Sequence, residues 1–211
     1  MSSPLTSQRD DPDQDDWAMP DEALWLTHDL TLRDGSVVRV RAIRADDTTR
    51  LQSFHAHLSM DSIIWRFFRS VPSLSDEQAR QFTHVDYVNR MALIATRGDD
   101  AAEEILAVVR YDRLAGAQEA EVAFVVQDAW QGHGLATALL YELAAYARAH
   151  GVERFVALTM GTNVRMLDVL HNCGFPCRTR YDGGDILATL DITAPPRFPL
   201  WTSAPDETAT R

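Results

Sequence analysis

A glycine-rich turn at residues 131–134 has the residue types of an anion-binding site. Gln131-Gly132-His133-Gly134 follows the strand-like run EVAFVV and precedes the helix-like run LATALL. The start of a helix carries unpaired backbone N–H groups and a partial positive charge. Glycine lets a ligand approach the backbone because it has no Cβ, and phosphate or pyrophosphate is the anion that such a turn typically binds. Two glycines alone leave a second interpretation open, in which the turn binds nothing.

Two common phosphate motifs are excluded by the residues around this turn. The dinucleotide fingerprint needs a glycine or an alanine three residues after Gly134, where the chain has Thr137. The P-loop needs Gly-Lys followed by Ser or Thr, and the chain lacks it. A phosphate site at this turn therefore belongs to another class.

The elements that must position this turn predict an α+β fold. The runs RMALIATR, EEILAVVRY and AEVAFVV follow one another and are typical of an antiparallel meander. After the turn, apolar residues at helical spacing predict a long helix that ends at Gly151. RFVALTM then predicts a strand, VRMLDVLHNC a helix, and PCRTRY with DILATLDI (residues 176–192) a hairpin. This order predicts a central mixed sheet, mostly antiparallel, with helices on both faces.

Composition limits the classes of function. The 211 residues carry a net charge of −11, which argues against a nucleic-acid partner. Seven acids against one arginine in residues 1–22 predict an acidic, disordered tail. The chain has no secretory signal and no apolar run of membrane-spanning length. With only two cysteines, we expect a cytoplasmic protein without a membrane partner.

Two motifs together resemble those of the GCN5-related N-acetyltransferases (GNAT). The first is Gln131-Gly132-His133-Gly134-Leu135-Ala136, with Trp130 before it, and the second is Asn163-Val164-Arg165-Met166 followed by Gly174-Phe175. The segments LRDGSVVRVRAIRADD, SIIWRFF and AEVAFVVQDAWQGHG resemble the catalytic domain of bacterial Pat-type protein-lysine acetyltransferases, over roughly residues 30–192. The resemblance implies the GNAT fold, whose strands splay to admit the pantetheine arm of coenzyme A. It also implies acetyl-CoA as the acyl donor, without a metal.

Acetyl transfer to an amine requires a general base, because a lysine with a pKa near 10.4 is protonated at neutral pH. Alternation along AEVAFVV puts Glu119 and Glu121 on the face that carries Ala123 and Val125. A carboxylate among such apolar side chains should be desolvated, which raises its pKa. The resemblance assigns the base to Glu121. Glu119, and a purely structural Glu121 paired with an arginine such as Arg110, remain as alternatives.

The resemblance also assigns the residues that hold the donor. Backbone groups of Phe124, Val125 and Val126 would bind the pantetheine arm and polarise the thioester carbonyl. Asn163 and Met166 belong to the second motif, and Asn163 would contact the donor near the pantetheine. The pyrophosphate would lie on the backbone N–H groups of the loop and first helical turn, namely Gln131, Gly132, His133, Gly134, Leu135, Ala136 and Thr137.

Two positions depart from the family pattern. Many members have a tyrosine, proposed to protonate the leaving thiolate, where this chain has Leu170, so no general acid is assigned. His133 stands where lysine or arginine is more common, which predicts weaker and more pH-dependent phosphate binding.

The cysteines and histidines do not predict a metal site. Cys173 and Cys177 have no second cysteine pair. His55 and His57 lie two residues apart on a predicted helix, so they point to different sides.

The sequence therefore predicts one GNAT domain at residues 25–192, an acidic tail at 1–24 and a proline-containing tail at 193–211 that docks through Trp201. The leading hypothesis is transfer of an acetyl group to a lysine of a protein, specifically an acyl-CoA synthetase, bound at an acidic groove rim. The alternatives are acetylation of a small amine or antibiotic, and a non-catalytic CoA-binding or interaction module. The sequence does not predict the oligomeric state.

Overall fold

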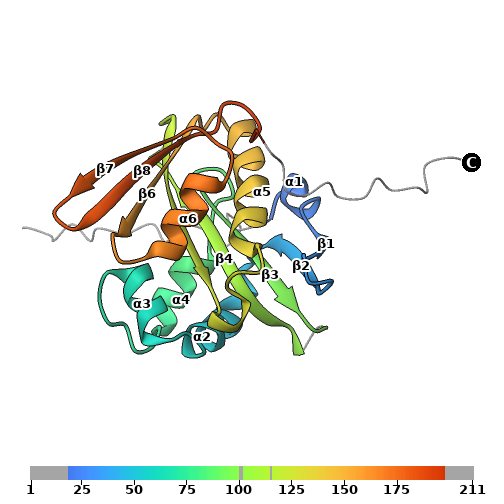
Figure 1. Ribbon diagram of the computed structural model, residues 1–211. Coiled ribbons are helices and arrows are strands. Elements are labelled where there is room, and N and C mark those ends of the chain that lie inside the picture. The colour runs from blue at the N-terminus through green and yellow to red at the C-terminus, as the bar shows by residue number, and fades with distance from the viewer. Residues whose placement is uncertain (1–18, 100–101, 115, 198–211) are drawn as a thin grey trace, which may run out of the picture.

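The computed structural model describes residues 19–99, 102–114 and 116–197, coloured along the chain in Figure 1. The predictions for the first 18 residues and for Trp201 fall outside these residues. Eight strands form one sheet: β1 (His28–Thr31), β2 (Val37–Ala42), β3 (Arg90–Arg97), β4 (Glu104–Asp112), β5 (Glu119–Val126), β6 (Arg154–Met160), β7 (Cys177–Asp182) and β8 (Asp185–Asp191). The helices are α1 (Asp21–Leu24), α2 (Thr48–Ala56), α3 (Met60–Phe67), α4 (Asp76–Thr83), α5 (Leu135–Ala149) and α6 (Val164–Asn172), with 3-10 turns η1 (Ala45–Asp47) and η3 (Asp128–Trp130).

The sheet confirms the predicted fold class. Its strand order is β1-β2-β3-β4-β5-β6-β8-β7. Every neighbouring pair is antiparallel except β5 and β6, which run parallel because α5 connects them across the sheet. The meander predicted for the three runs before the glycine turn is β3-β4-β5.

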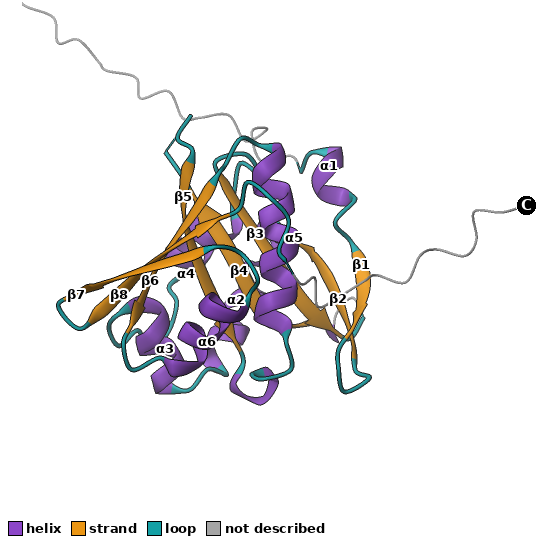
Figure 2. Cartoon of the chain, turned by 45° about the horizontal axis from the view of Figure 1, so that its top comes forward, coloured by secondary structure: helices purple, strands orange, loops and turns teal. Residues whose placement is uncertain are grey.

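Helices cover the central strands on both sides. α5 packs on β3, β4 and β5, while α2 packs on β4 and against α4 (Figure 2). β4 is buried over Ile105–Tyr111 without alternation, which is expected for a strand covered on both faces. The core therefore lies around β3, β4 and α5, and it makes a rigid floor for the strand that follows β4.

β5 and β6 separate after a short pairing. Their register pairs only Glu119, Ala120 and Glu121 with residues 154–156. Beyond Glu121 the two strands diverge, so the backbone groups on this side of residues 122–126 face a gap instead of a partner strand. This is the splay that the family resemblance implies.

A cluster of ion pairs connects β2 to the segments that follow it and that precede β4. Arg41 of β2 bonds through Nη1 to Asp47 Oδ2 at 2.7 Å and through Nη2 to Glu103 Oε2 at 2.7 Å. Burial disfavours the charged guanidinium, but its bonds to both carboxylates outweigh burial and hold the pKa of Arg41 above its ordinary value. The cluster joins β2, η1 and the segment before β4.

The N-terminal boundary differs from the predicted one. Residues 21–24, assigned to the tail from their acidity, form α1, and Ala23 is fully buried. Asp21 and Glu22 lie in the first helical turn, where negative charge is favourable. Acidity at this point stabilises a short helix, and the folded part begins before residue 25.

Candidate active site

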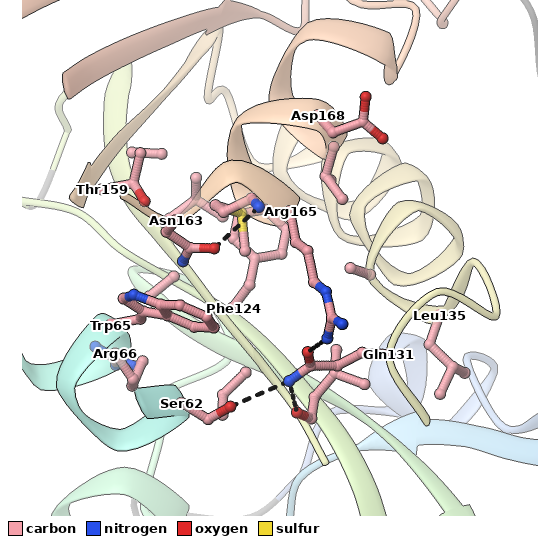
Figure 3. A pocket seen from close by; sticks show the side chains of 18 of the residues that line it. Ser62, Trp65, Arg66, Phe124, Gln131, Leu135, Thr159, Asn163, Arg165 and Asp168 are labelled. Carbon is pink, nitrogen blue, oxygen red and sulfur yellow. Dashed lines mark hydrogen bonds between the residues drawn. The ribbon is translucent and has the colours of Figure 1, made fainter. Parts of the chain in front are cut away.

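A cavity of about 680 Å³ opens between the diverging strands (Figure 3). α3 forms one wall, residues 121–126 of β5 line its base, and β6 with α6 form the opposite wall. The glycine turn and the first turn of α5 close one end. The predicted site residues that line it are Glu121, Phe124, Val125, Val126, Gln131, Gly132, Gly134, Leu135, Ala136, Thr137, Asn163 and Met166.

The glycine turn has the backbone that its sequence predicts. Gly132 and Gly134 have φ of +84° and +89°, conformations that side chains disfavour. Gly134 is the N-cap of α5 and offers no side-chain cap to the first helical N–H groups. A Cβ on Gly132 would meet no protein atom within 4 Å, so open space surrounds this glycine. The turn and the first residues of α5 line the cavity, and the start of a helix carries unpaired N–H groups, which suits an anion.

Gln131 ties this turn to both walls of the cavity. Its side-chain Nε2 donates to Ser62 Oγ of α3 and to the carbonyl of Val126, each at 3.1 Å. Its Oε1 accepts a hydrogen bond from Arg165 of α6, drawn as a dashed line in Figure 3. The position of α3 therefore depends on the turn, a link that sequence patterns did not predict.

His133 is the one predicted donor-binding residue whose side chain does not line the cavity. Its Nε2 lies 3.4 Å from Asp34 Oδ2, and its ring packs on Trp130 at 5.9 Å between centroids. The carboxylate and the indole hold the imidazole away from the cavity. In this position the imidazole does not line the cavity, and its effect on phosphate binding stays a prediction.

Glu121 lines the cavity at the last residue of the β5–β6 pairing. Its side chain is exposed, so the prediction of a desolvated carboxylate is wrong. The predicted alternation of faces along β5 is present, but β6 diverges after Glu121, which leaves the Glu121 side chain exposed to solvent. Cross-strand pairing places it opposite Asp112 of β4.

Two arginines lie close to Glu121. Arg110 of β4 is buried and donates to Asp112 Oδ2 at 2.9 Å, so it does not pair with Glu121. Arg66 of α3 lines the cavity, and burial together with the charge of Arg110 lowers its pKa to about 10, against the opposing influence of Glu121. Arg66 is therefore the arginine of the cavity lining whose charge interacts with Glu121.

Glu119 is excluded from the cavity lining. It pairs with Arg154 at 2.8 Å between Oε1 and Nε, on the exposed edge of the β5–β6 ladder. Its carboxylate has a local partner and faces solvent. The alternative assignment of Glu119 as the base thus has no support in this geometry.

Asn163 is the N-cap of α6, and its Oδ1 accepts a hydrogen bond from the Met166 backbone at 3.1 Å. Its side-chain amide nitrogen has no hydrogen-bond partner among the described residues. Because Asn163 is buried and lines the cavity, this amide is available to a ligand.

Thr159 of β6 is a cavity residue that sequence reasoning missed. It is 2% exposed, and its Oγ1 has no hydrogen-bond partner among the described residues. Asn163, four residues later, was recognised through its motif, whereas RFVALTM gave Thr159 no signal beyond a strand pattern. Figure 3 shows both side chains on the same wall.

The charges that line the cavity overturn the prediction of an acidic rim. Four arginines, at positions 33, 66, 69 and 165, line it, against the two acids Glu121 and Asp168. Net charge failed as a guide because seven acids lie in residues 1–22. Leu170, at the position of the usual family tyrosine, is fully buried, and no tyrosine of the described chain lines the cavity.

Comparison with known proteins identifies the family. Residues 38–176 match the model of the acetyltransferase (GNAT) domain. The chain belongs to the GNAT acetyltransferase family. It is therefore an acyl-transferring enzyme by family, and acetyl-CoA is the donor that GNAT enzymes use.

Its relatives include acetyltransferases of the Pat type. The GNAT domain of S. lividans PAT is 42% identical, with a TM-score of 0.73, over 79% of this chain and 97% of that one. Acetyltransferase Pat of Mycolicibacterium smegmatis is 28% identical over 77% of this chain, which spans only 48% of that relative. Acetyltransferase PA5475 of Pseudomonas aeruginosa is 28% identical over 69% of this chain and 78% of that protein.

No helix in the described part of the chain is long and apolar enough to cross a membrane. No group of three or more histidines, cysteines or acids among those residues is arranged to hold a metal ion.

Proposed function

We propose that this protein transfers the acetyl group of acetyl-CoA to the side-chain amine of a lysine in another protein, with Glu121 as the general base. The observation that carries the proposal is the 42% identity to the GNAT domain of S. lividans PAT over nearly all of that domain. The alternative of a small amine or antibiotic rests on the same donor motifs. Acetyltransferase PA5475 of Pseudomonas aeruginosa, whose name gives no acceptor, is compatible with either.

The cavity residues fit the donor that the family uses. The turn at Gly132 and Gly134 offers backbone N–H groups to the pyrophosphate, and Arg165 and Arg33 add positive charge at the cavity. The open side of Phe124, Val125 and Val126 offers extended backbone to the pantetheine arm, whose amides can then pair as a neighbouring strand would. When bound, the donor supplies the activated acetyl thioester.

Glu121 takes the proton of the attacking amine. A lysine ammonium must lose a proton before its nitrogen can attack the carbonyl carbon. The exposed position of Glu121 allows this transfer directly or through a water molecule. The C–N bond then forms, the C–S bond breaks, and the electron pair leaves with the sulfur.

Backbone N–H groups on the open side of β5 polarise the thioester carbonyl as negative charge develops on its oxygen. With Leu170 buried and no tyrosine lining the described cavity, solvent supplies the proton to the thiolate.

The arginines favour an acceptor lysine that lies among acidic residues. Arg66 and Arg69 line the same cavity as Glu121, so acidic neighbours of the lysine would be attracted and basic ones repelled. From the resemblance to Pat-type enzymes, we propose an acyl-CoA synthetase as the acceptor class, with acidic residues around the lysine that is acetylated.

The acceptor is tested by mixing the protein with acetyl-CoA and purified acetyl-CoA synthetase. We expect acetyl-lysine on the synthetase by mass spectrometry and a matching loss of synthetase activity. Short peptides containing the lysine should react more slowly, because remote contacts supply part of the orientation. An unmodified, active synthetase alongside rapid turnover of a small amine would replace this acceptor with the small-molecule one.

The base is tested by the pair Glu121→Gln and Glu119→Gln. Glutamine keeps the shape of the side chain but does not accept the proton, so Glu121→Gln should lower kcat by roughly 10² to 10⁴ without weakening acetyl-CoA binding by calorimetry. Glu119→Gln changes a neighbouring carboxylate that does not line the cavity and should keep near wild-type turnover. Equal activity of both variants at pH 7 would make Glu121 a structural residue.

A further inference from the structure

Asp128, just after β5, holds the first turn of α3 although 66 residues separate it from Ser62. Its Oδ2 accepts from the Ser59 backbone N–H at 2.9 Å, and its Oδ1 accepts from the hydroxyls of Ser59 and Ser62 at 2.7 and 3.0 Å. Ser59 is also the N-cap of α3, since its Oγ accepts from the Ser62 backbone at 3.2 Å. One carboxylate therefore bonds to both the N-cap residue and the first turn of the helix.

The same cluster reaches the turn that we assign to the pyrophosphate. Ser62 Oγ donates to Asp128 and accepts from Gln131 Nε2 at 3.1 Å. Ser62 is buried, so water competes poorly for these bonds. A continuous path of hydrogen bonds thus runs from Gln131 through Ser62 to Asp128, and it crosses from the donor-binding turn to the helix that forms the facing wall.

α3 is short, and this attachment at its start complements the packing of Phe67 on His55 and Phe82 near its end. It has eight residues, and only Ser62 and Ile63 are buried. A helix of this length is marginal without tertiary contacts. The negative charge of Asp128 at its N-terminus is favourable to the helix dipole. Burial opposes ionisation of Asp128, but hydrogen bonds from Ser59 and Ser62 outweigh it and hold the pKa of Asp128 below its ordinary value.

α3 in turn presents the wall of the cavity next to Glu121. Trp65, Arg66 and Phe67 line the cavity from its second half, and the helix ends at Phe68 with a left-handed φ of 56°. Figure 3 shows Trp65 and Arg66 on the wall that faces Asn163 and Thr159. A small rotation of α3 would displace these side chains together.

We propose that Asp128 is a positioning residue, and that the path through Ser62 couples donor binding at the turn to the order of α3 and hence to acceptor binding. The coupling rests on the proposed function, while the attachment of α3 by Asp128 does not. Binding of the pyrophosphate fixes Gln131, Gln131 fixes Ser62, and α3 then holds its aromatic wall for the acceptor. The enzyme should accordingly bind the acceptor more tightly after acetyl-CoA than before it.

Hydrogen exchange of the α3 amides with and without coenzyme A tests the coupling directly. In the wild-type protein, saturating coenzyme A should slow exchange in residues 63–68 by about two- to tenfold, the effect of one neutral hydrogen bond such as that from Gln131 to Ser62. Ser62→Ala removes the link to Gln131 but leaves the Ser59 cap, so the slowing should disappear even at coenzyme A concentrations that calorimetry shows to saturate the variant. Unchanged slowing in Ser62→Ala would overturn the coupling.

Asp128→Asn and Asp61→Asn form a matched pair for the attachment. Both remove one negative charge at the start of α3, but no bond to Asp61 is present among the described residues. Asp128→Asn should speed α3 exchange without any ligand and raise the acceptor KM roughly tenfold more than the acetyl-CoA KM. Asp61→Asn should match the wild type. Equal exchange in the two variants would overturn the attachment.

These readouts also separate the two levels of the proposal. If wild-type protein failed to bind coenzyme A, the proposed function and the coupling would both fall. Ligand-free exchange in Asp128→Asn would still decide the attachment, because it requires neither donor nor acceptor.

Discussion

Single residues in the cavity differ in how far the sequence could predict them. The turn from Gln131 to Thr137 was predictable because its function depends on consecutive residues and on a helix start that local pattern reveals. Glu121 was predictable in its direction, since alternation fixes the face of a strand, but its exposure was not. Exposure depends on where β6 leaves β5, which no pattern within AEVAFVV contains. Thr159 carried no signal at all.

Thr159 gives a prediction about the stability of the ligand-free protein. Its buried hydroxyl has no partner among the described residues, and such a group costs about 1–3 kcal/mol. Thr159→Val keeps the shape and removes that cost, so the ligand-free protein should melt at a temperature higher by about 2–4 °C per kcal/mol. A lower melting temperature in scanning calorimetry would show that the hydroxyl is satisfied in solution. Thr159→Ser, which keeps the hydroxyl, is the control.

At the scale of elements, the long helix α5 and the turn before it act as one unit. The periodicity of its leucines predicted the helix, and Gly151 predicted its end, because both signals are local. The attachment of α3 to this unit was not predictable, since Ser62 and Asp128 are joined only by the fold. Sequence reasoning thus predicted the turn and the helix at one end of the cavity and missed what holds α3 in place.

The two ends of α5 allow a matched test of the turn. Gly134 and Gly151 have φ of +89° and +79°, so alanine at either position strains the backbone by a similar amount, about 1 kcal/mol. Gly134→Ala and Gly151→Ala should therefore lower the melting temperature alike. Only Gly134→Ala should weaken acetyl-CoA binding in calorimetry, because Gly151 does not line the cavity. If the two variants bound acetyl-CoA with similar affinity, the assignment of the pyrophosphate site to this turn would be wrong.

At the scale of the whole molecule, the order of elements predicted the mixed sheet, whereas net charge misled. The order of strands and helices is a global pattern that survives errors at single residues. Net charge says nothing about where the charges lie. A chain with a net charge of −11 here has a cavity lined by four arginines. Local positive charge in a negative protein draws an anionic donor to one place and keeps it off the rest of the surface.

The ion cluster on Arg41 predicts how the whole fold responds to acid. The bond from Arg41 holds the pKa of Glu103 below its ordinary 4.5, so the folded state binds this proton less readily than the unfolded state. The stabilisation is therefore present above pH 4.5 and is lost as pH falls below it. Glu103→Gln should lower the free energy of unfolding by about 1–3 kcal/mol at pH 7.

The difference between wild type and Glu103→Gln should shrink as the pH of a denaturant titration falls below 4.5. Glu77→Gln, at an exposed carboxylate of α4, should track the wild type at every pH. If the difference in the free energy of unfolding between wild type and Glu103→Gln stayed constant down to pH 3, protonation of Glu103 would not contribute to acid unfolding.

β5 pairs with β6 over only three residues, so the rest of β5 lacks a partner strand on that side. Under the proposed function, the pantetheine arm supplies the missing strand, and that arm is identical in the donor and in the spent coenzyme. The two carbons that are transferred contribute little to the fit. Free coenzyme A should consequently bind nearly as tightly as acetyl-CoA. We therefore expect turnover to be governed by the residence time of coenzyme A and by the cellular ratio of acetyl-CoA to coenzyme A.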